Sequence, residues 1–165
     1  MKSPNAGLRF AAVAAAFLML AACSTADDGA GANTESTAGQ VQPGSQADLE
    51  QNVGDRVFFD TDKSSLSDEA RATLQRQAAW MAQYGSLTFT IEGHADERGT
   101  REYNLALGGR RANAAKDYLV SLGVAPSRLN TVSYGKERPV CLDSSESCWS
   151  QNRRAVTVIV SGVGS

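Results

Sequence analysis

Four short stretches after residue 53 have the pattern or composition of β-strands. The clearest stretch is 87–92, where every second residue is apolar, as in a strand with one buried face. The last stretch is rich in β-branched residues, which favour strands. The four predicted strands are residues 56–60, 87–92, 129–134 and 155–160.

Two helices are predicted between these strands, because apolar residues there recur every three or four positions. Ser67 is the expected N-cap of the first helix, and Thr100 that of the second, which should run from Arg101 to about Leu122. The first helix should bury Ala70, Leu74, Ala78 and Met81. The second should bury Leu105, Gly108, Ala112, Ala115, Leu119 and Leu122.

The order of these elements is strand, helix, strand, helix, strand, strand. Alternating elements need crossover connections, so part of the sheet must be parallel. We therefore predict an α/β (α+β) two-layer sandwich with a βαβαββ order, in which the helices pack on a mixed four-stranded sheet. The domain is expected to occupy residues 53–165.

The first 22 residues have the layout of a secretory signal. Lys2 and Arg9 precede an uncharged apolar run that is too short to span a bilayer. Cys23 follows Leu20 and two alanines, which resembles the lipobox of bacterial lipoproteins. That resemblance implies lipidation of Cys23, and Ser24 in place of Asp implies the outer membrane. The alternative is an ordinary signal peptide with a chance cysteine.

Residues 23–52 are predicted to form the lipidated cysteine and a disordered tether. After Cys23 this stretch has five acidic residues, no Lys or Arg, and many Gly, Ala, Ser and Thr residues. With 16 basic and 18 acidic residues in all, the remaining domain is close to neutral. The domain therefore offers no broad basic surface, so a nucleic-acid partner is not expected.

The loop at residues 92–100 carries most of the candidate chemistry. It joins a predicted strand to a predicted helix and contains His94, Asp96, Glu97 and Arg98. On a helical wheel of about 100° per residue, Asn104, Leu107 and Arg111 lie along the border of the buried face. Arg111 therefore lies on the same side as Asp96.

An Asp and an Arg placed in this way have two interpretations. The pair can be a plain salt bridge that contributes only to the fold. It can also bind a zwitterion, with Asp96 accepting from an ammonium group and the Arg111 guanidinium donating two parallel hydrogen bonds to a carboxylate. The sequence leaves both open.

Cys141 and Cys148 lie close together in a polar, loop-like stretch of an exported chain. Exported compartments oxidise thiols, so a disulfide is expected, and two free thiols are the alternative.

Several separated motifs resemble the OmpA-like peptidoglycan-binding domain family. They include the loop Gly-His-Ala-Asp-Glu-Arg-Gly-Thr at 93–100, Arg-Arg-Ala-Asn at 110–113 and Asn-Arg-Arg-Ala at 152–155. The resemblance implies non-covalent binding of the meso-diaminopimelate of the peptidoglycan stem peptide. Together with the lipobox and tether, it also implies the Tol–Pal system and its partner TolB. The alternative is a wall-binding lipoprotein of the same family that acts without TolB.

By the family pattern, Asp96 and Arg111 carry the main recognition of the wall peptide. The other residues that the resemblance places around the pocket are Phe59, Asp60, Arg98, Asn104 and Leu107. No cofactor is implied.

A metal-assisted hydrolase is the alternative interpretation of His94, Asp96 and Glu97. His94 is the only histidine in the chain, and zinc sites use three or four ligands, commonly several His or Cys. We therefore expect no enzyme and no metal site, and interpret His94 as a structural hydrogen-bonding residue.

Overall fold

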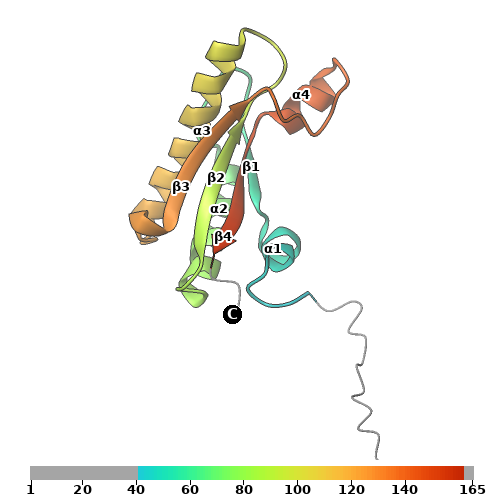
Figure 1. Cartoon of the computed structure of the whole chain (residues 1–165). Coiled ribbons are helices and arrows are strands. Elements are labelled where there is room, and N and C mark those ends of the chain that lie inside the picture. The colour runs from blue at the N-terminus through green and yellow to red at the C-terminus, as the bar shows by residue number, and fades with distance from the viewer. Residues whose placement is uncertain (1–40, 162–165) are drawn as a thin grey trace, which may run out of the picture. The chain divides into compact units, whose positions relative to one another are not determined.

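The structure, a computed structural model, describes residues 41–161. The predicted strands are β1 (Arg56–Phe58), β2 (Thr88–His94), β3 (Leu129–Gly135) and β4 (Arg154–Ser161). The predicted helices are α2 (Asp68–Gln83) and α3 (Arg101–Ser121), and Figure 1 shows their arrangement. A short turn, η2 (Pro126–Arg128), leads into β3.

The sheet has the strand order β1-β4-β2-β3. β4 is antiparallel to both β1 and β2, whereas β2 and β3 are parallel, because α3 crosses over between them. The predicted mixed sheet of an α+β domain is therefore confirmed. β1 and β3 form the two edges, and the loop after β2 starts from the middle of the sheet.

The core lies between the sheet and the two long helices. Phe89 and Ile91 of β2 are fully buried, as the alternating pattern predicts. Helix α2 begins at its expected N-cap, Ser67, and buries all four predicted residues. Thr100 caps α3 by accepting a hydrogen bond from the backbone N–H of Tyr103.

The predicted packing face of α3 is partly wrong. Leu105 and Leu122 are exposed, whereas Asn104, Leu107 and Arg111 are buried. The buried face is rotated towards Asn104 and Arg111, so these residues do not lie at its border. The rotation brings the polar residues of α3 under the loop that follows β2.

Two glycines explain how α3 lies so close to the sheet. A Cβ atom on Gly93 of β2 would come within 1.8 Å of the carbonyl oxygen of Gly108, and a Cβ atom on Gly108 would lie 2.4 Å from Ser133 Oγ. Neither position accepts a larger residue without moving backbone. Close packing therefore explains Gly108, whereas a Cβ atom on Gly109 would only reach Ser133 Cβ at an ordinary 3.9 Å.

The N-terminal boundary of the domain differs from the prediction. Residues 41–52 belong to the folded domain, and a short helix, α1 (Gln46–Asp48), continues into the π-helical turn η1 (Leu49–Val53). Leu49 is completely buried, and Asp48 accepts a hydrogen bond from Trp80 Nε1 at 2.9 Å. The apolar side chain of Leu49 and the hydrogen-bonded carboxylate of Asp48 both help to hold this segment on the domain. The rest of the predicted tether lies outside the described residues.

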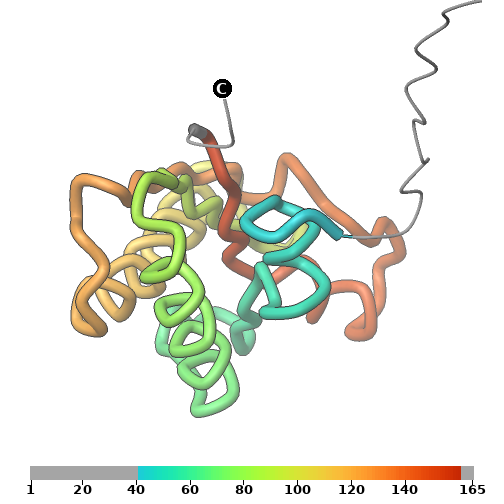
Figure 2. Tube along the Cα trace, turned by 90° about the horizontal axis from the view of Figure 1, so that it is seen from below, coloured from blue at the N-terminus to red at the C-terminus, as the bar shows by residue number. Residues whose placement is uncertain are grey.

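Helix α1 also protects an edge of the sheet. Gln46 accepts a hydrogen bond from the backbone N–H of Ile159 and donates one to the carbonyl of Thr157. β1 pairs with β4 only as far as Val156, so the Gln46 amide takes the place of a strand beyond that point. Figure 2 shows α1 beside this end of β4.

The polar stretch before β4 is not an irregular loop. It contains helix α4 (Glu146–Asn152), and a disulfide joins Cys141 to Cys148, with their Cα atoms 5.0 Å apart. Asn152 stabilises the turn by accepting from the backbone N–H of Val140 and donating to the carbonyl of Cys141. The sequence did not predict this helix, because its seven residues are too few to show a periodic apolar face.

His94, at the end of β2, is buried but does not form the hydrogen bonds that we expected. Its ring lies 5.6 Å from the Tyr134 ring, and neither ring nitrogen has a hydrogen-bond partner among residues 41–161. Burial lowers the pKa of His94 to about 4, and the positive charges of Arg154 and Arg138 add to the effect. The side chain is therefore a neutral packing residue at neutral pH.

Within residues 41–161, no helix has the length and apolar character needed to cross a membrane.

The two neighbouring glycines of α3 give a matched test of this packing. Gly109→Ala should stabilise the domain by about 0.5–1 kcal/mol, because alanine favours a helix interior and the space for its methyl group exists. Gly108→Ala should destabilise it by roughly 1–3 kcal/mol through overpacking against the sheet. Urea unfolding measures both. Equal effects of the two substitutions would contradict the described contact between Gly93 and Gly108.

Candidate functional site

The candidate site lies where β2, the loop after it and the start of α3 meet the segment that follows β1. A cavity of about 290 Å³ opens there. Five of the seven residues predicted for the wall-peptide site line it, namely Asp96, Arg98, Asn104, Leu107 and Arg111. Thr61, Asp62, Gly99 and Tyr103 complete the lining.

Arg111 is fully buried, yet its guanidinium pairs with backbone and not with a carboxylate. Nε donates to the carbonyl of Lys63 at 2.8 Å, Nη1 to that of His94 at 2.9 Å and Nη2 to that of Asp60 at 3.1 Å. A guanidinium has five N–H donors, so one N–H on each terminal nitrogen remains. No carboxylate oxygen of residues 41–161 lies within 4.0 Å of its nitrogens.

Burial lowers the pKa of Arg111 to about 10, and the negative charge of Asp96 opposes the shift. The group therefore stays positive at neutral pH. A buried positive charge without its own carboxylate is costly, and an anion in the cavity would relieve that cost. Carbonyl groups already fix the plane of the guanidinium, so little order would be lost on binding.

Asp96 is buried and its carboxylate is crowded with donors. Oδ1 accepts from the backbone N–H and from Nε of Arg98, while Oδ2 accepts from Nη2 of Arg98 at 2.7 Å and from Nη1 of Arg153 at 3.4 Å. An ionised carboxylate has about four lone-pair positions, and all are in use. A second cation can reach Asp96 only if one of these arginines moves.

The protonation of Asp96 fits this arrangement. Burial acts to raise the pKa of Asp96, but the hydrogen bonds and the charge of Arg98, with the hydrogen bond from Arg153, outweigh it and lower the pKa. The carboxylate is therefore ionised at neutral pH.

The salt-bridge interpretation of Asp96 and Arg111 is wrong for the described structure. Each residue uses other partners, although both line the same cavity. One wall thus presents a buried guanidinium and the other a buried carboxylate. Such a cavity is complementary to a group that carries a carboxylate and an ammonium close together.

Three residues of α3 stabilise the lining of this cavity. Asn104 donates from its side-chain amide to the carbonyl of Arg98 at 2.8 Å, which ties the loop to α3. Leu107 is buried at the base. Tyr103 donates a hydrogen bond to Asp62, and this contact joins α3 to the segment after β1.

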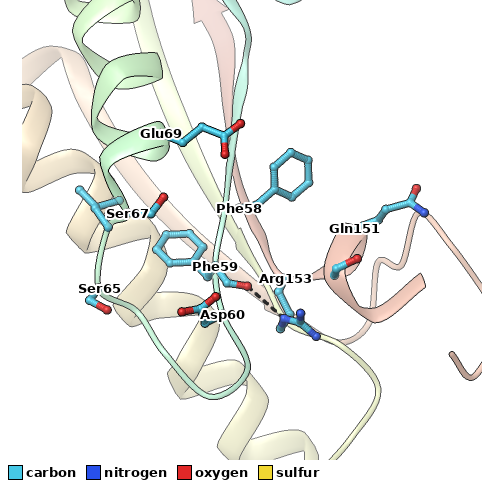
Figure 3. A pocket seen from close by; sticks show the side chains of 10 residues that line it. Phe58, Phe59, Asp60, Ser65, Ser67, Glu69, Gln151 and Arg153 are labelled. Carbon is cyan, nitrogen blue, oxygen red and sulfur yellow. Dashed lines mark hydrogen bonds between the residues drawn. The ribbon is translucent and has the colours of Figure 1, made fainter. Parts of the chain in front are cut away.

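Phe59 and Asp60 contribute less directly than predicted. Their side chains line a second cavity of about 530 Å³, which Figure 3 shows together with Arg153. The Phe59 ring still lies 5.3 Å from the guanidinium carbon of Arg111, and the carbonyl of Asp60 accepts from the same group. They therefore position Arg111 from the adjoining cavity.

Sequence reasoning missed three residues that hold the loop. Arg153 bridges the carboxylates of Asp96 and Glu146, with its Nη2 2.5 Å from the latter. Trp149 of α4 stacks on the Arg98 guanidinium at 4.1 Å and donates its indole N–H to Glu97. The signal for Arg153 was present in the Asn-Arg-Arg motif, whereas nothing in the sequence marked Glu146 or Trp149.

Cys141 and Cys148 do not line this cavity. Cys23 is outside the described residues. Within the described part of the chain, no three His, Cys, Asp or Glu side chains come together in an arrangement that would hold a metal ion.

Comparison with known proteins identifies the family. Residues 58–154 match the OmpA family. A peptidoglycan-associated lipoprotein of Rhizobium meliloti is 64% identical over 128 residues, which make up 78% of this chain and 72% of the relative. One from Haemophilus influenzae is 43% identical over 145 residues, or 87% of this chain and 92% of the relative.

Solved structures agree with these matches. The crystal structure of the peptidoglycan-associated lipoprotein from Burkholderia pseudomallei superimposes with a TM-score of 0.63 at 44% identity, covering 64% of this chain and 90% of that chain. The C-terminal domain of Helicobacter pylori MotB has a TM-score of 0.62 at 19% identity, which shows a shared fold alone. The chain therefore belongs to the OmpA family and, within it, to the peptidoglycan-associated lipoproteins.

Proposed function

We propose that this protein binds peptidoglycan non-covalently through the meso-diaminopimelate of the uncrosslinked stem peptide. The far end of that residue carries an ammonium and a carboxylate on one carbon atom. The observation that carries the proposal is the buried Arg111, which has no carboxylate partner among the described residues and lines the same cavity as the buried Asp96. The names of the related lipoproteins, which are peptidoglycan-associated, support peptidoglycan as the polymer that is bound.

Binding requires an exchange of partners at Asp96. The ligand carboxylate accepts hydrogen bonds from the two remaining N–H groups of Arg111, which Lys63, His94 and Asp60 hold in place. The ligand ammonium takes the lone pairs of Asp96 that Arg98 occupies in the free protein. Arg98 has a partly exposed side chain, so it is the arginine that can leave, whereas Arg153 is buried.

We further propose that the protein anchors the outer membrane to the cell wall as part of the Tol–Pal system. A lipid on Cys23 would hold one end in the outer membrane, while the domain binds the wall in the periplasm. This arrangement supports envelope integrity and constriction of the outer membrane at division. No bond is broken in this function, and the family is not enzymatic.

The binding site is tested by calorimetric titration of residues 24–165 with the tripeptide L-Ala–D-Glu–meso-diaminopimelate. Arg111→Lys and Asp96→Asn should each weaken binding about 10- to 100-fold, because each loses charge-assisted hydrogen bonds worth roughly 1.5–3 kcal/mol. Arg110→Lys is the matched control, because Arg110 is exposed and should leave the affinity unchanged.

Circular dichroism must show that the variants are folded, since Arg111 also holds three carbonyl groups of the domain. If a folded Asp96→Asn variant bound as tightly as the wild type, the zwitterion site would be refuted. Absence of tripeptide binding by the folded wild type would refute the proposal as a whole.

The alternative within the family is a wall-binding lipoprotein that acts without TolB. TolB from the same organism should be captured by immobilised residues 24–165 near physiological salt. Repeating the capture with excess stem tripeptide tests whether the TolB-binding surface overlaps the wall-peptide site. Failure to capture TolB, with tripeptide binding intact, would contradict the Tol–Pal assignment and favour the alternative.

A further inference from the structure

The second cavity, with a volume of about 530 Å³, has no role in the proposed binding of diaminopimelate. It is bounded by the end of β1, by the segment that leads into α2 and by α4. Its size is within the range of about 300–1,000 Å³ that is usual for ligand sites. Figure 3 shows Phe58, Glu69, Gln151 and Arg153 around it.

We propose that this cavity binds the glycan of the same wall polymer whose stem peptide occupies the cavity between Asp96 and Arg111. The proposal rests on the proposed function and extends it from the peptide to the amino sugars that carry the peptide. The ligand class is a neutral N-acetylated saccharide.

Phe58 provides an apolar platform for a sugar ring. Its side chain is 49% exposed at the edge of the sheet, whereas the adjacent Phe59 is buried. A half-exposed aromatic ring with polar groups beside it suits a pyranose, because the C–H groups of one sugar face pack on the ring while the hydroxyl groups reach outwards. Figure 3 shows the Glu69 carboxylate next to Phe58.

The polar lining is rich in groups that bond to hydroxyl and amide groups. Glu69 and Asp60 offer carboxylate acceptors, and Gln151 offers a carboxamide. The serine hydroxyls of the lining, which both donate and accept, are those of Ser65, Ser67 and Ser150. This combination matches the hydroxyl and N-acetyl groups of amino sugars.

The charges favour a neutral ligand over an anion. Among residues 41–161, Arg153 is the only cation that lines the cavity, and its charge is already balanced by Asp96 and Glu146. Lys63 offsets the charge of Asp60 at 3.1 Å, and Glu69 adds a negative charge, so the lining does not favour a phosphate or a free carboxylate. The lactyl carboxyl group of muramic acid is an amide in the wall, and the sugar therefore brings no negative charge.

The two cavities share their dividing wall. Arg153 lines the second cavity and donates to Asp96 in the first. Asp60 lines the second cavity, while its carbonyl accepts from Arg111. Since the stem peptide is covalently attached to the sugar, a polymer bound at one cavity holds its other part at high effective concentration near the second.

The test compares two ligands by calorimetry on residues 24–165, which contain every described residue. The ligands are the stem tripeptide and the same tripeptide carried on N-acetylglucosaminyl-N-acetylmuramic acid. The wild type should bind the disaccharide tripeptide about fivefold to tenfold more tightly, the value of one good aromatic contact. Phe58→Ala should abolish this difference and leave the tripeptide affinity unchanged, whereas Phe58→Tyr should retain the difference.

Leu105→Ala is the matched control, because Leu105 is 50% exposed and lines a different cavity. It should keep the gain from the disaccharide. Equal affinities of the wild type for the two ligands would overturn the glycan site, as would a gain that survives Phe58→Ala. Loss of TolB capture by Phe58→Ala, with the glycan gain intact, would assign the cavity to a protein partner instead. If the wild type bound neither ligand, the proposed function itself would fail.

Discussion

The buried guanidinium of Arg111 is the interaction on which the site depends. It joins α3 to the carbonyl groups of Asp60 and Lys63, after β1, and to that of His94, at the end of β2. Three segments far apart in the sequence thus meet at one side chain. The close approach of α3 to the sheet at Gly93 and Gly108 makes this reach possible.

The proposed binding of a zwitterion also requires that the positive charge beside Asp96 can be exchanged. Arg98 occupies most of the carboxylate in the free protein, and α4 holds Arg98 through Trp149 and anchors Arg153 through Glu146. Helix α4 is itself fixed by the disulfide and by Asn152. The loop is therefore ordered before a ligand arrives, which reduces the entropic cost of binding.

The sequence predicted the elements whose signal is periodic. The alternating pattern predicted β2, and the apolar face predicted α2. The motifs around Asp96 and Arg111 predicted five of the residues that line the first cavity. The sequence did not predict the structure of segments that are held by individual contacts with distant residues. Leu49 looked like part of a tether because the residues around it are mostly polar, and only the folded domain supplies its partners.

The hydrogen-bond partners of Asp96 also could not be predicted from the sequence. The helical wheel of α3 placed Arg111 on the side of Asp96. It did not predict that Arg111 would donate to carbonyl groups, or that Asp96 would accept from Arg98 and Arg153. Such choices depend on distances between segments that the chain brings together only on folding. For the same reason, the position of Phe59 and Asp60 in the adjoining cavity could not be predicted.

A structure of the domain with the stem tripeptide bound tests the central claim most directly. The account predicts that the terminal carboxylate of diaminopimelate lies within hydrogen-bonding distance of both terminal nitrogens of Arg111. It also predicts that the ammonium contacts Asp96 and that the Arg98 guanidinium has left that carboxylate. A bound tripeptide that leaves the pair of Arg98 and Asp96 intact and lies elsewhere on the domain would contradict the account.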